Sequence, residues 1–201
     1  MEIVSRLQDK YSLNNPIFID EIRLMFKNYS KIRIAQLIQE SINNDRLARF
    51  TSGVYYIPTK TLFGNSILST IKVIEKKYIK NDVEVYGFYF GITFMNNIGI
   101  STQVPNIYEI MTNNESTRVR KVKVNNQEVI LRKSRVMINK NNYKTLQFLE
   151  FITSTNMEIL LNNVKKINEY FLKNIDKKQL IQYMIKYPSK VIKNLYSLGL
   201  I

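Results

Sequence analysis

The sequence predicts an α+β fold, and each part of the chain contributes one observation to that prediction. Helical apolar periodicity alternates with short β-rich runs up to residue 61, β-rich runs dominate residues 62–152, and residues 153–201 are helical in pattern. Of the 201 residues, 45% are hydrophobic, which is enough to bury a core of ordinary size. We predict an N-terminal domain (1–61), a mixed α+β domain (62–152) and a helical C-terminal extension (153–201) packed on the second domain.

The N-terminal domain opens with a short helix that ends before Ser12. The buried face of this helix is predicted to hold three apolar side chains: Ile3, Val4 and Leu7. The run Ile17–Ile19 follows a proline and is too short for a helix, so we predict a brief strand there. Asp20 is a favourable N-cap for a second helix, which extends to Phe26 before a turn at residues 27–29.

A third helix and a hairpin complete this domain. Ser30 is predicted to cap the helix, and Asn43-Asn44-Asp45 is predicted to end it. Apolar residues recur along it at the helical period: Ile34, Ala35, Ile38 and Ile42. Two β-rich runs, residues 47–50 and 54–57, then flank Thr51-Ser52-Gly53, a hairpin loop whose last residue is glycine.

This order of elements (helix, strand, helix, turn, helix, hairpin) is typical of a winged helix-turn-helix domain. In that domain the third helix enters the DNA major groove, where Arg can bond guanine and Gln can bond adenine through two hydrogen bonds. The hairpin lies along the backbone, where phosphate contacts are expected. We expect DNA contacts from these residues: Lys27, Asn28, Ser30, Lys31, Arg33, Gln36, Gln39, Arg49 and Ser52. Two alternatives to DNA binding stay open. The exposed polar side chains are only solvated, as is common on a helix face, or the winged helix docks a protein.

The rest of the chain is predicted to mix strands and helices and then to become wholly helical. The strands of the second domain are expected at 83–90, 104–111, 117–124 and 129–133, the last two joined at Asn125-Asn126. Its helices are expected after Phe63-Gly64-Asn65, over 92–98 after Gly91, and from Asn141-Asn142 to Phe151. The helices of the extension are expected from Met157 to Leu172, from the N-cap Asp176 to Tyr187, and from Pro188 to Gly199.

The predicted hairpin of the second domain carries the densest positive charge in the chain. Between residues 116 and 135, Glu128 is the only acidic residue, and the local net charge is +6. The basic residues are Arg118, Arg120, Lys121, Lys123, Arg132, Lys133 and Arg135. Alternation along the strands can gather such side chains on one face that binds DNA or an acidic partner. Alternatively, the charges protect an edge strand against aggregation.

The whole chain is strongly basic. Thirty Lys and Arg against sixteen Asp and Glu give a formal charge of +14, a field that attracts polyanions. The charge is +3 over residues 1–62, +6 over 63–152 and +5 over 153–201, so the predicted DNA-reading domain is the least basic part. Abundant Lys, Asn and Ile also fit AT-rich codon usage, which is the alternative origin of part of this charge.

Composition also excludes whole classes of chemistry. The chain has no Cys and no His, which excludes disulfides, Cys/His zinc sites, thiolate nucleophiles and His-based acid–base catalysis. The carboxylates of the second domain form no compact pattern of the kind that metal-dependent nucleases use, and no glycine spacing makes a phosphate loop. We expect a protein that is not an enzyme and that uses no metal and no cofactor.

The sequence also lacks the patterns that direct a chain to a membrane. No stretch approaches the roughly 18 apolar residues of a membrane-spanning helix. The first residues carry Glu2, Asp9 and Asp20 and lack the apolar run of a signal peptide. We expect a cytoplasmic protein with no membrane partner, present as a monomer or a weak dimer.

Several segments resemble the AbiEi-type antitoxins, the transcriptional-regulator halves of bacterial type IV toxin–antitoxin pairs associated with abortive phage infection. In the wing region the resemblance is carried by Phe50–Pro58 and Thr61-Leu62-Phe63-Gly64. The second domain carries a more specific set: Tyr86–Gly91, Asn96–Asn106, Glu109-Ile110, Thr112-Asn113-Asn114 and Leu131–Arg135. Within that set, Thr102-Gln103-Val104-Pro105-Asn106 is the most specific stretch. The resemblance runs from residue 16 to residue 152.

The resemblance implies a winged-helix repressor of its own operon. It implies sequence-specific binding to double-stranded operator DNA, where we expect inverted repeats. It also implies that the protein counters a nucleotidyltransferase-like toxin without forming a stable complex with it. The alternative from another functional class is a protein-interaction module whose basic hairpin docks an acidic partner without reading DNA.

Overall fold

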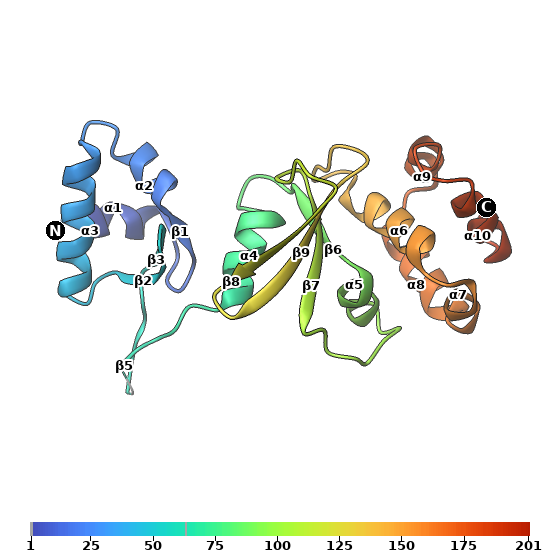
Figure 1. The fold of residues 1–201 in the computed structure, drawn as a ribbon, viewed down its shortest axis with the longest axis horizontal. Helices are drawn as coiled ribbons and strands as arrows, with labels where there is room; N and C mark the ends of the chain where they lie inside the picture. The colour runs from blue at the N-terminus through green and yellow to red at the C-terminus, as the bar shows by residue number, and fades with distance from the viewer. Residues whose placement is uncertain (1, 63) are drawn as a thin grey trace. The chain divides into compact units, whose positions relative to one another are not determined.

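A computed structural model describes residues 2–62 and 64–201. The chain divides into two compact units, Met1–Lys76 and Lys77–Ile201, and each unit contains both helices and strands (Figure 1). The fold is therefore mixed α+β with a helical C-terminal region, as the sequence predicts. The boundary between the units falls after Lys76, whereas the predicted boundary lies between residues 61 and 62.

The first unit contains three helices and a three-stranded sheet before its C-terminal segment. These elements are α1 (Glu2–Lys10), β1 (Ile17–Phe18), α2 (Ile19–Met25), α3 (Lys31–Asn43), β2 (Ala48–Thr51) and β3 (Val54–Tyr56). Strand β3 lies in the middle of the sheet and pairs antiparallel with both β1 and β2. The elements follow one another in the order expected from the sequence.

The N-terminal caps of α2 and α3 include one correct and one wrong prediction. Ser30 caps α3 as predicted, because its hydroxyl oxygen accepts a hydrogen bond from the backbone N–H of Arg33 at 3.1 Å. Asp20 is not the N-cap of α2, because the N-cap position is Phe18, two residues earlier. Glu21 supplies the capping contact instead, since its carboxylate accepts from the backbone N–H of Phe18 at 2.7 Å.

The core of the first unit joins α1, α2 and α3 to the sheet. Its most deeply buried side chains are Ile3, Leu7, Ile17, Ile22, Ile34, Leu47 and Ile57. The predicted apolar faces of the first and third helices are therefore largely buried. Ala35 is an exception, because it is exposed and lines a groove between α3 and the hairpin.

The helix predicted after residues 63–65 is present but begins later than expected. Of the three residues expected to lead it, Gly64 and Asn65 form strand β5 (Gly64–Asn65), which pairs antiparallel with β4 (Lys60–Thr61), and Phe63 lies outside the described residues. Gly64 has φ of 106°, which glycine reaches without the steric cost of a Cβ, so the chain turns back at this point. Helix α4 (Thr70–Tyr78) begins later.

The first turns of α4 belong to the first unit, and two of their lysines bond its N-terminal part. The ammonium of Lys72 donates to the backbone oxygen of Asn14 at 3.0 Å, and that of Lys76 donates to the backbone oxygen of Pro16 at 2.7 Å. These contacts join α4 to the loop before β1. Sequence patterning does not reveal them, because the partners are backbone oxygens more than fifty residues away in the chain.

The second unit is built on a four-stranded sheet in the order β6-β7-β9-β8 (Figure 1). The strands are β6 (Gly87–Phe90), β7 (Ile107–Thr112), β8 (Val119–Val124) and β9 (Gln127–Lys133). Strand β7 pairs antiparallel with β6 and parallel with β9, and β8 is an edge strand that pairs antiparallel with β9. The β8–β9 hairpin turns at Asn125-Asn126 as predicted, with Asn125 at φ of 52°.

Strands β6 and β7 begin later than predicted. Strand β6 begins at Gly87, whose N–H donates to the backbone oxygen of Ile79 at 2.9 Å. A Cβ at Gly87 would lie 2.0 Å from the backbone oxygen of Tyr78, so only glycine fits against the end of α4. Strand β7 begins at Ile107, two residues after Pro105, which has no N–H to donate to a sheet.

Six further helices belong to the second unit. They are α5 (Gly91–Asn97), α6 (Tyr143–Ser154), α7 (Met157–Asn162), α8 (Val164–Asn174), α9 (Lys177–Met184) and α10 (Lys190–Ser197). The single helix predicted over 157–172 is two helices, because the backbone of Asn163 (φ −124°, ψ 20°) breaks it. Asp176 caps α9 as predicted and accepts from the backbone N–H of Lys178 at 2.9 Å.

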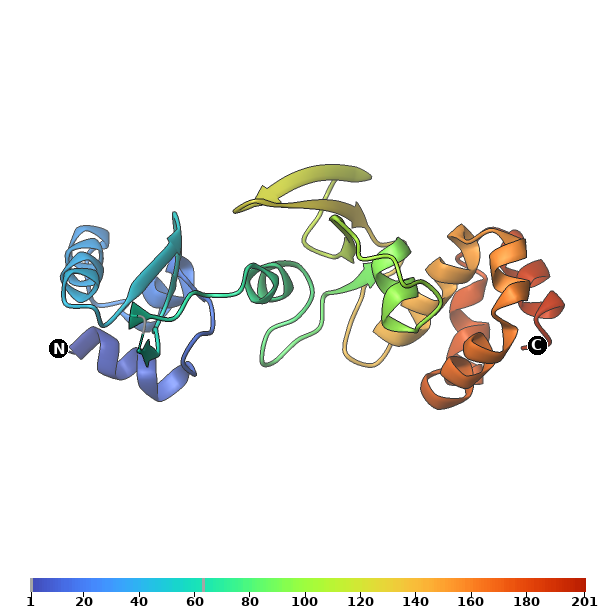
Figure 2. The same cartoon turned by 90° about the horizontal axis from the view of Figure 1, so that it is seen from below.

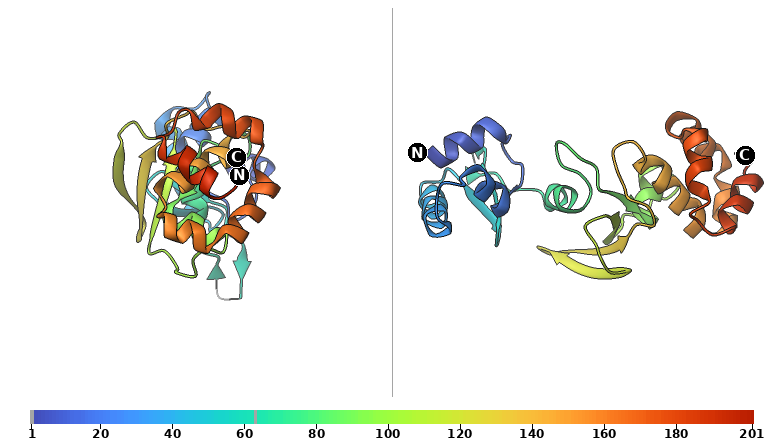
Figure 3. Two further views of the ribbon diagram at one scale, coloured as in Figure 1. Left: turned by 90° about the vertical axis from the view of Figure 1, so that its right-hand side faces the viewer. Right: turned by 90° about the horizontal axis from the view of Figure 1, so that it is seen from above.

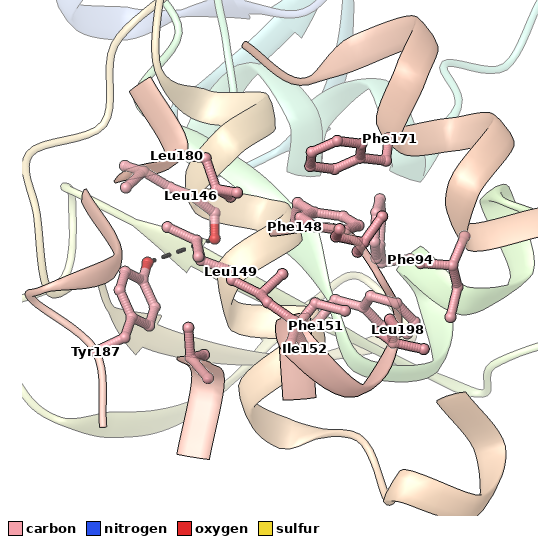
Figure 4. Packing of buried hydrophobic residues seen from close by; sticks show 14 of the residues in the cluster. Phe94, Leu146, Phe148, Leu149, Phe151, Ile152, Phe171, Leu180, Tyr187 and Leu198 are labelled. Atoms are coloured by element: carbon pink, nitrogen blue, oxygen red, sulfur yellow. Dashed lines mark hydrogen bonds between the residues drawn. The ribbon is translucent and has the colours of Figure 1, made fainter. Parts of the chain in front are cut away.

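The C-terminal helices and the sheet share one hydrophobic core, centred on α6 (Figure 4). On α6, Phe148 lies 5.6 Å from Phe171 of α8 between ring centres, and Phe151 lies 5.5 Å from Phe94 of α5. The hydroxyl of Tyr187 donates to the backbone oxygen of Leu146 at 3.4 Å. The last three helices are thus part of the second unit's core.

Candidate nucleic-acid interface

A groove of about 310 Å³ runs between α3 and the β2–β3 hairpin, beside the start of α2. Its polar lining comes from three elements: Arg23, Lys31, Gln39, Arg49 and Ser52. Its apolar lining is Ile19, Ala35, Ile38, Ile42 and Tyr55, with Gly53. Four of the nine residues predicted to contact DNA therefore line one groove, although they are spread from residue 31 to residue 52.

The hairpin presents Arg49 to this groove. Arg49 pairs across the sheet with Tyr55, and its guanidinium carbon lies 6.0 Å from the centre of that ring. The register shifts between Arg49 and Thr51, and Gly53 takes φ of 76° to close the loop. The backbone oxygen of Gly53 accepts from the N–H of Ile19 at 2.9 Å, which ties the loop to the start of α2.

Arg23 lies in the same groove but does not appear among the predicted contacts. It is in the last turn of α2, and its guanidinium is 3.0 Å from the carboxylate of Asp20, one turn earlier. The sequence signal for Arg23 is its place three residues after an acidic residue in a predicted helix.

The outward face of α3 forms a row of side chains at helical spacing: Ile32, Gln36, Gln39 and Asn43. The side-chain amide of Gln39 donates to the amide oxygen of Asn43 at 2.9 Å. Ile32 is 74% exposed, and it is not among the predicted contacts because an apolar side chain in a helix is ordinarily expected to face the core. Both predicted glutamines are therefore presented to solvent together with an apolar neighbour.

Arg33 lies away from the groove. Its guanidinium donates to the amide oxygen of Gln36 at 3.5 Å and lies 3.9 Å from the carboxylate of Glu40. Both charged side chains are about half exposed, so this pair can open at little cost. Arg33 is therefore held by weak contacts within α3.

The three remaining predicted contacts lie around the turn between α2 and α3. Lys27 and Asn28 line a separate hollow of about 330 Å³ beside Phe26 and Tyr29. The hydroxyl of Ser30 is occupied by the cap of α3. The nine predicted residues are thus divided among a groove, an outer helix face and a turn.

The basic hairpin of the second unit does not form one continuous basic face. The hairpin extends away from the C-terminal helices (Figures 2 and 3). By strand register, Lys121, Lys123 and Arg132 share one side of the sheet, whereas Arg120 lies on the other side. Lys133 lines a hollow of about 480 Å³ together with Arg120.

Three of the seven predicted basic residues are paired with carboxylates from neighbouring segments. The pairs are Arg120–Glu115 at 2.7 Å, Arg132–Glu109 at 3.7 Å and Arg135–Glu150 at 3.2 Å. All three partners lie outside the window of residues 116–135, so the local count overestimates the positive charge of the folded hairpin. The four residues with no ion pair among the described residues are Arg118, Lys121, Lys123 and Lys133.

Two of these carboxylates have shifted pKa values. The pKa of Glu115 is lowered from 4.5 to about 2, first because the backbone N–H of Thr117 donates to it at 3.0 Å, and also because of Arg120. Burial raises the pKa of Glu150 above its usual value, and the Arg135 guanidinium partly offsets this effect. Glu115 is therefore a firmly ionised carboxylate that organises the start of the hairpin.

Within residues 2–62 and 64–201, no cluster of three or more His, Cys, Asp or Glu side chains is arranged to hold a metal ion. The described part of the chain also contains no helix with the length and apolar character needed to cross a membrane. No family model matches the chain, and no characterised protein matches its sequence.

Proposed function

We propose that this protein is a sequence-specific DNA-binding transcriptional repressor. Its reading module is a winged helix-turn-helix formed by α1, α2, α3 and the β2–β3 hairpin. The observation that carries the proposal is the convergence of Arg23, Lys31 and Arg49 on the groove between α3 and the hairpin. Cationic side chains from a helix pair and a wing are the arrangement that positions such a domain on the phosphate backbone.

The outer face of α3 supplies the groups for base readout. Gln36 and Gln39 are exposed and can each bond the N6 and N7 positions of adenine. The Ser30 cap holds the first turn of α3 in place. In helix-turn-helix domains, the N-terminal end of the recognition helix is the part that contacts base edges. The groove then contributes affinity, and the outer face of α3 contributes sequence preference.

The first unit carries a small net charge, so its proposed DNA contacts depend more on where its cationic side chains lie than on overall attraction to a polyanion. Residues 1–76 contain eleven Lys and Arg against seven Asp and Glu, a net charge of +4. Residues 77–201 contain nineteen against nine, a net charge of +10. The second unit therefore has the stronger field for polyanions, and its unpaired cations on the hairpin add a sequence-independent DNA contact in this proposal.

We also propose that the protein represses its own operon as the antitoxin of a type IV pair. The resemblance of residues 16–152 to AbiEi-type antitoxins supports this role. In the most specific stretch, Gln103 and Val104 are exposed in the loop before β7. The partner is a nucleotidyltransferase-like toxin encoded beside it, and co-expression of the two in a growth assay tests protection.

DNA selection from a random pool tests the regulatory proposal directly. The full chain is expected to enrich one sequence, and footprinting should then map its contact on that duplex. Arg49→Ala should weaken binding to all duplexes, whereas Arg46→Ala is the matched control, because Arg46 is exposed and outside the groove. Enrichment of no sequence, together with equal binding by both variants, would reject a DNA-reading role.

A further inference from the structure

The most exposed large apolar side chain of α3 is Ile32, in the first turn of the helix. It contributes nothing to the core, which α3 contacts through Ile34 and Ile38. Ile32 lies one turn before Gln36 on the same outward face. Single exposed apolar residues are common on protein surfaces, so exposure alone does not mark Ile32 as functional. Its position does, because it lies in one row with Gln36 and Gln39, which are proposed to read bases.

We propose that Ile32 is a specificity-determining residue that contacts the 5-methyl group of a thymine in the DNA major groove. This inference rests on the proposed function and goes beyond it, because it assigns a base to a residue without hydrogen-bonding groups. Thymine is the base that presents a methyl group in the major groove, and apolar side chains recognise it by contact. An exposed, branched apolar side chain at the tip of a recognition helix matches that chemistry.

The surroundings of Ile32 suit close approach to DNA. The first turn of α3 contains no acidic residue, and Lys31 precedes Ile32 on the side of the groove. The N-terminus of a helix also carries a partial positive charge, which favours nearby phosphates. This end of α3 can therefore approach the backbone without electrostatic repulsion.

Helix geometry also predicts where the thymine lies. Side chains one helical turn apart are separated by about 5.4 Å, and successive bases rise by about 3.4 Å along a strand. Ile32 and Gln36 therefore reach bases that are one or two steps apart. The selected sequence should contain a thymine one or two base pairs from an adenine whose recognition depends on Gln36.

Replacement of single thymines by deoxyuridine tests the contact, because that change deletes only the 5-methyl group. The probe is the duplex that the full chain selects from a random pool, with one thymine replaced at a time. At one or two positions, wild-type protein should lose affinity about fourfold, the effect of one buried methyl or methylene group. Ile32→Ala should bind the thymine and deoxyuridine duplexes equally well.

Two further variants separate the contact from other effects. Ile32→Val keeps a branched apolar side chain and should remain sensitive to the methyl group. Leu24→Ala is the control, because Leu24 is 64% exposed on α2 and lies outside the row on α3. Its methyl sensitivity should equal that of wild type, and thermal unfolding should show that all variants are folded.

Each outcome decides the inference. Loss of methyl sensitivity in Ile32→Ala alone supports it. A selected sequence at which no thymine is sensitive, or at which Ile32→Ala stays as sensitive as wild type, overturns it and leaves the proposed function standing. A full chain that selects no sequence contradicts the proposed function, and the methyl contact is rejected with it.

Discussion

The ammonium of Lys76 lies 2.9 Å from both carboxylate oxygens of Glu21. The same ammonium donates to the backbone oxygen of Pro16 and lies 4.8 Å from the centre of the Tyr11 ring. Glu21 meanwhile caps α2 through the backbone N–H of Phe18. One ion pair therefore joins the start of a helix that supports the proposed DNA-binding groove to helix α4.

Lys76→Met should destabilise the protein by roughly 1–3 kcal/mol. The Lys76 side chain is 14% exposed and that of Glu21 is 29% exposed, so the pair is partly buried and its loss leaves a carboxylate poorly solvated. Urea denaturation of the full chain measures the change. Lys72→Met is the control: Lys72 is exposed and bonds neutral oxygens, so its loss should cost less. Equal effects of the two variants would contradict the importance of the ion pair.

Glu40→Gln should increase affinity for the selected duplex. The change removes a negative charge from α3 and releases Arg33, which now lies 3.9 Å from the Glu40 carboxylate. A half-exposed pair is worth up to about 1 kcal/mol, which corresponds to roughly fivefold in Kd. Fluorescence anisotropy measures the change.

Arg33→Ala should then cost about 1–3 kcal/mol in binding to the selected duplex and relax preference at one base pair. An effect of similar size on a random duplex would show that Arg33 contacts phosphate. Identical binding by wild type and Arg33→Ala would remove Arg33 from the interface.

Arg49→Ala should lower the salt dependence of DNA binding without changing sequence preference. Arg49 lies on the hairpin beside Ser52, where phosphate contacts are expected. Each neutralised phosphate contributes about 0.9 to the slope of log K against log salt. A salt titration on selected and random duplexes provides the measurement. An unchanged slope with altered preference would show that Arg49 reads a base.

The double variant Lys121→Ala/Lys123→Ala tests the second basic site in the same way. Both side chains lie on edge strand β8 and have no ion pair among the described residues. Two phosphate contacts would contribute about 1.8 to the slope. If the hairpin docks an acidic protein instead, the slope and sequence preference should stay unchanged. Loss of toxin protection with intact promoter repression would then identify that role.

Glu115→Gln should lower the free energy of unfolding near neutral pH by about 1–3 kcal/mol, because a buried carboxylate loses charge-assisted hydrogen bonds. The pKa of Glu115 is about 2 in the folded protein, below its ordinary value of 4.5. Its contribution is therefore present above pH 4.5 and is lost as the pH falls from 4.5 towards 2. The difference between wild type and variant should shrink over that range in acid titrations. Glu128→Gln, an exposed control, should show a smaller effect.

Local patterning was sufficient for elements that local contacts define. Ser30 and Asp176 cap their helices as predicted, and the hairpin turns at Asn125-Asn126, because each depends on residues a few positions apart. The cap of α2 could not be predicted, since Asp20 has the right chemistry but Glu21 makes the contact. Favourable residues in adjacent positions compete, and only the backbone path decides between them.

The candidate site was harder to predict than the elements that carry it. Helical spacing placed Lys31, Gln36 and Gln39 on the exposed part of α3, since one helix fixes their relation. The pairing of Arg120 with Glu115 depends on how a loop folds beside a strand. The charge count over residues 116–135 left out such partners, so it overestimated the free charge of the hairpin.

The position of β9 between β7 and β8 has a consequence for the order of folding. Strands β8 and β9 are joined by a two-residue turn, so their pairing closes a short loop and can form within microseconds. The parallel pairing of β7 with β9 joins residues about twenty positions apart, as in Ile107 with Glu128, and must wait for a longer loop to close. We expect the hairpin to form first and then to dock on β7 as one piece. Substitutions at the turn should therefore slow folding, whereas those in the parallel seam should mainly speed unfolding.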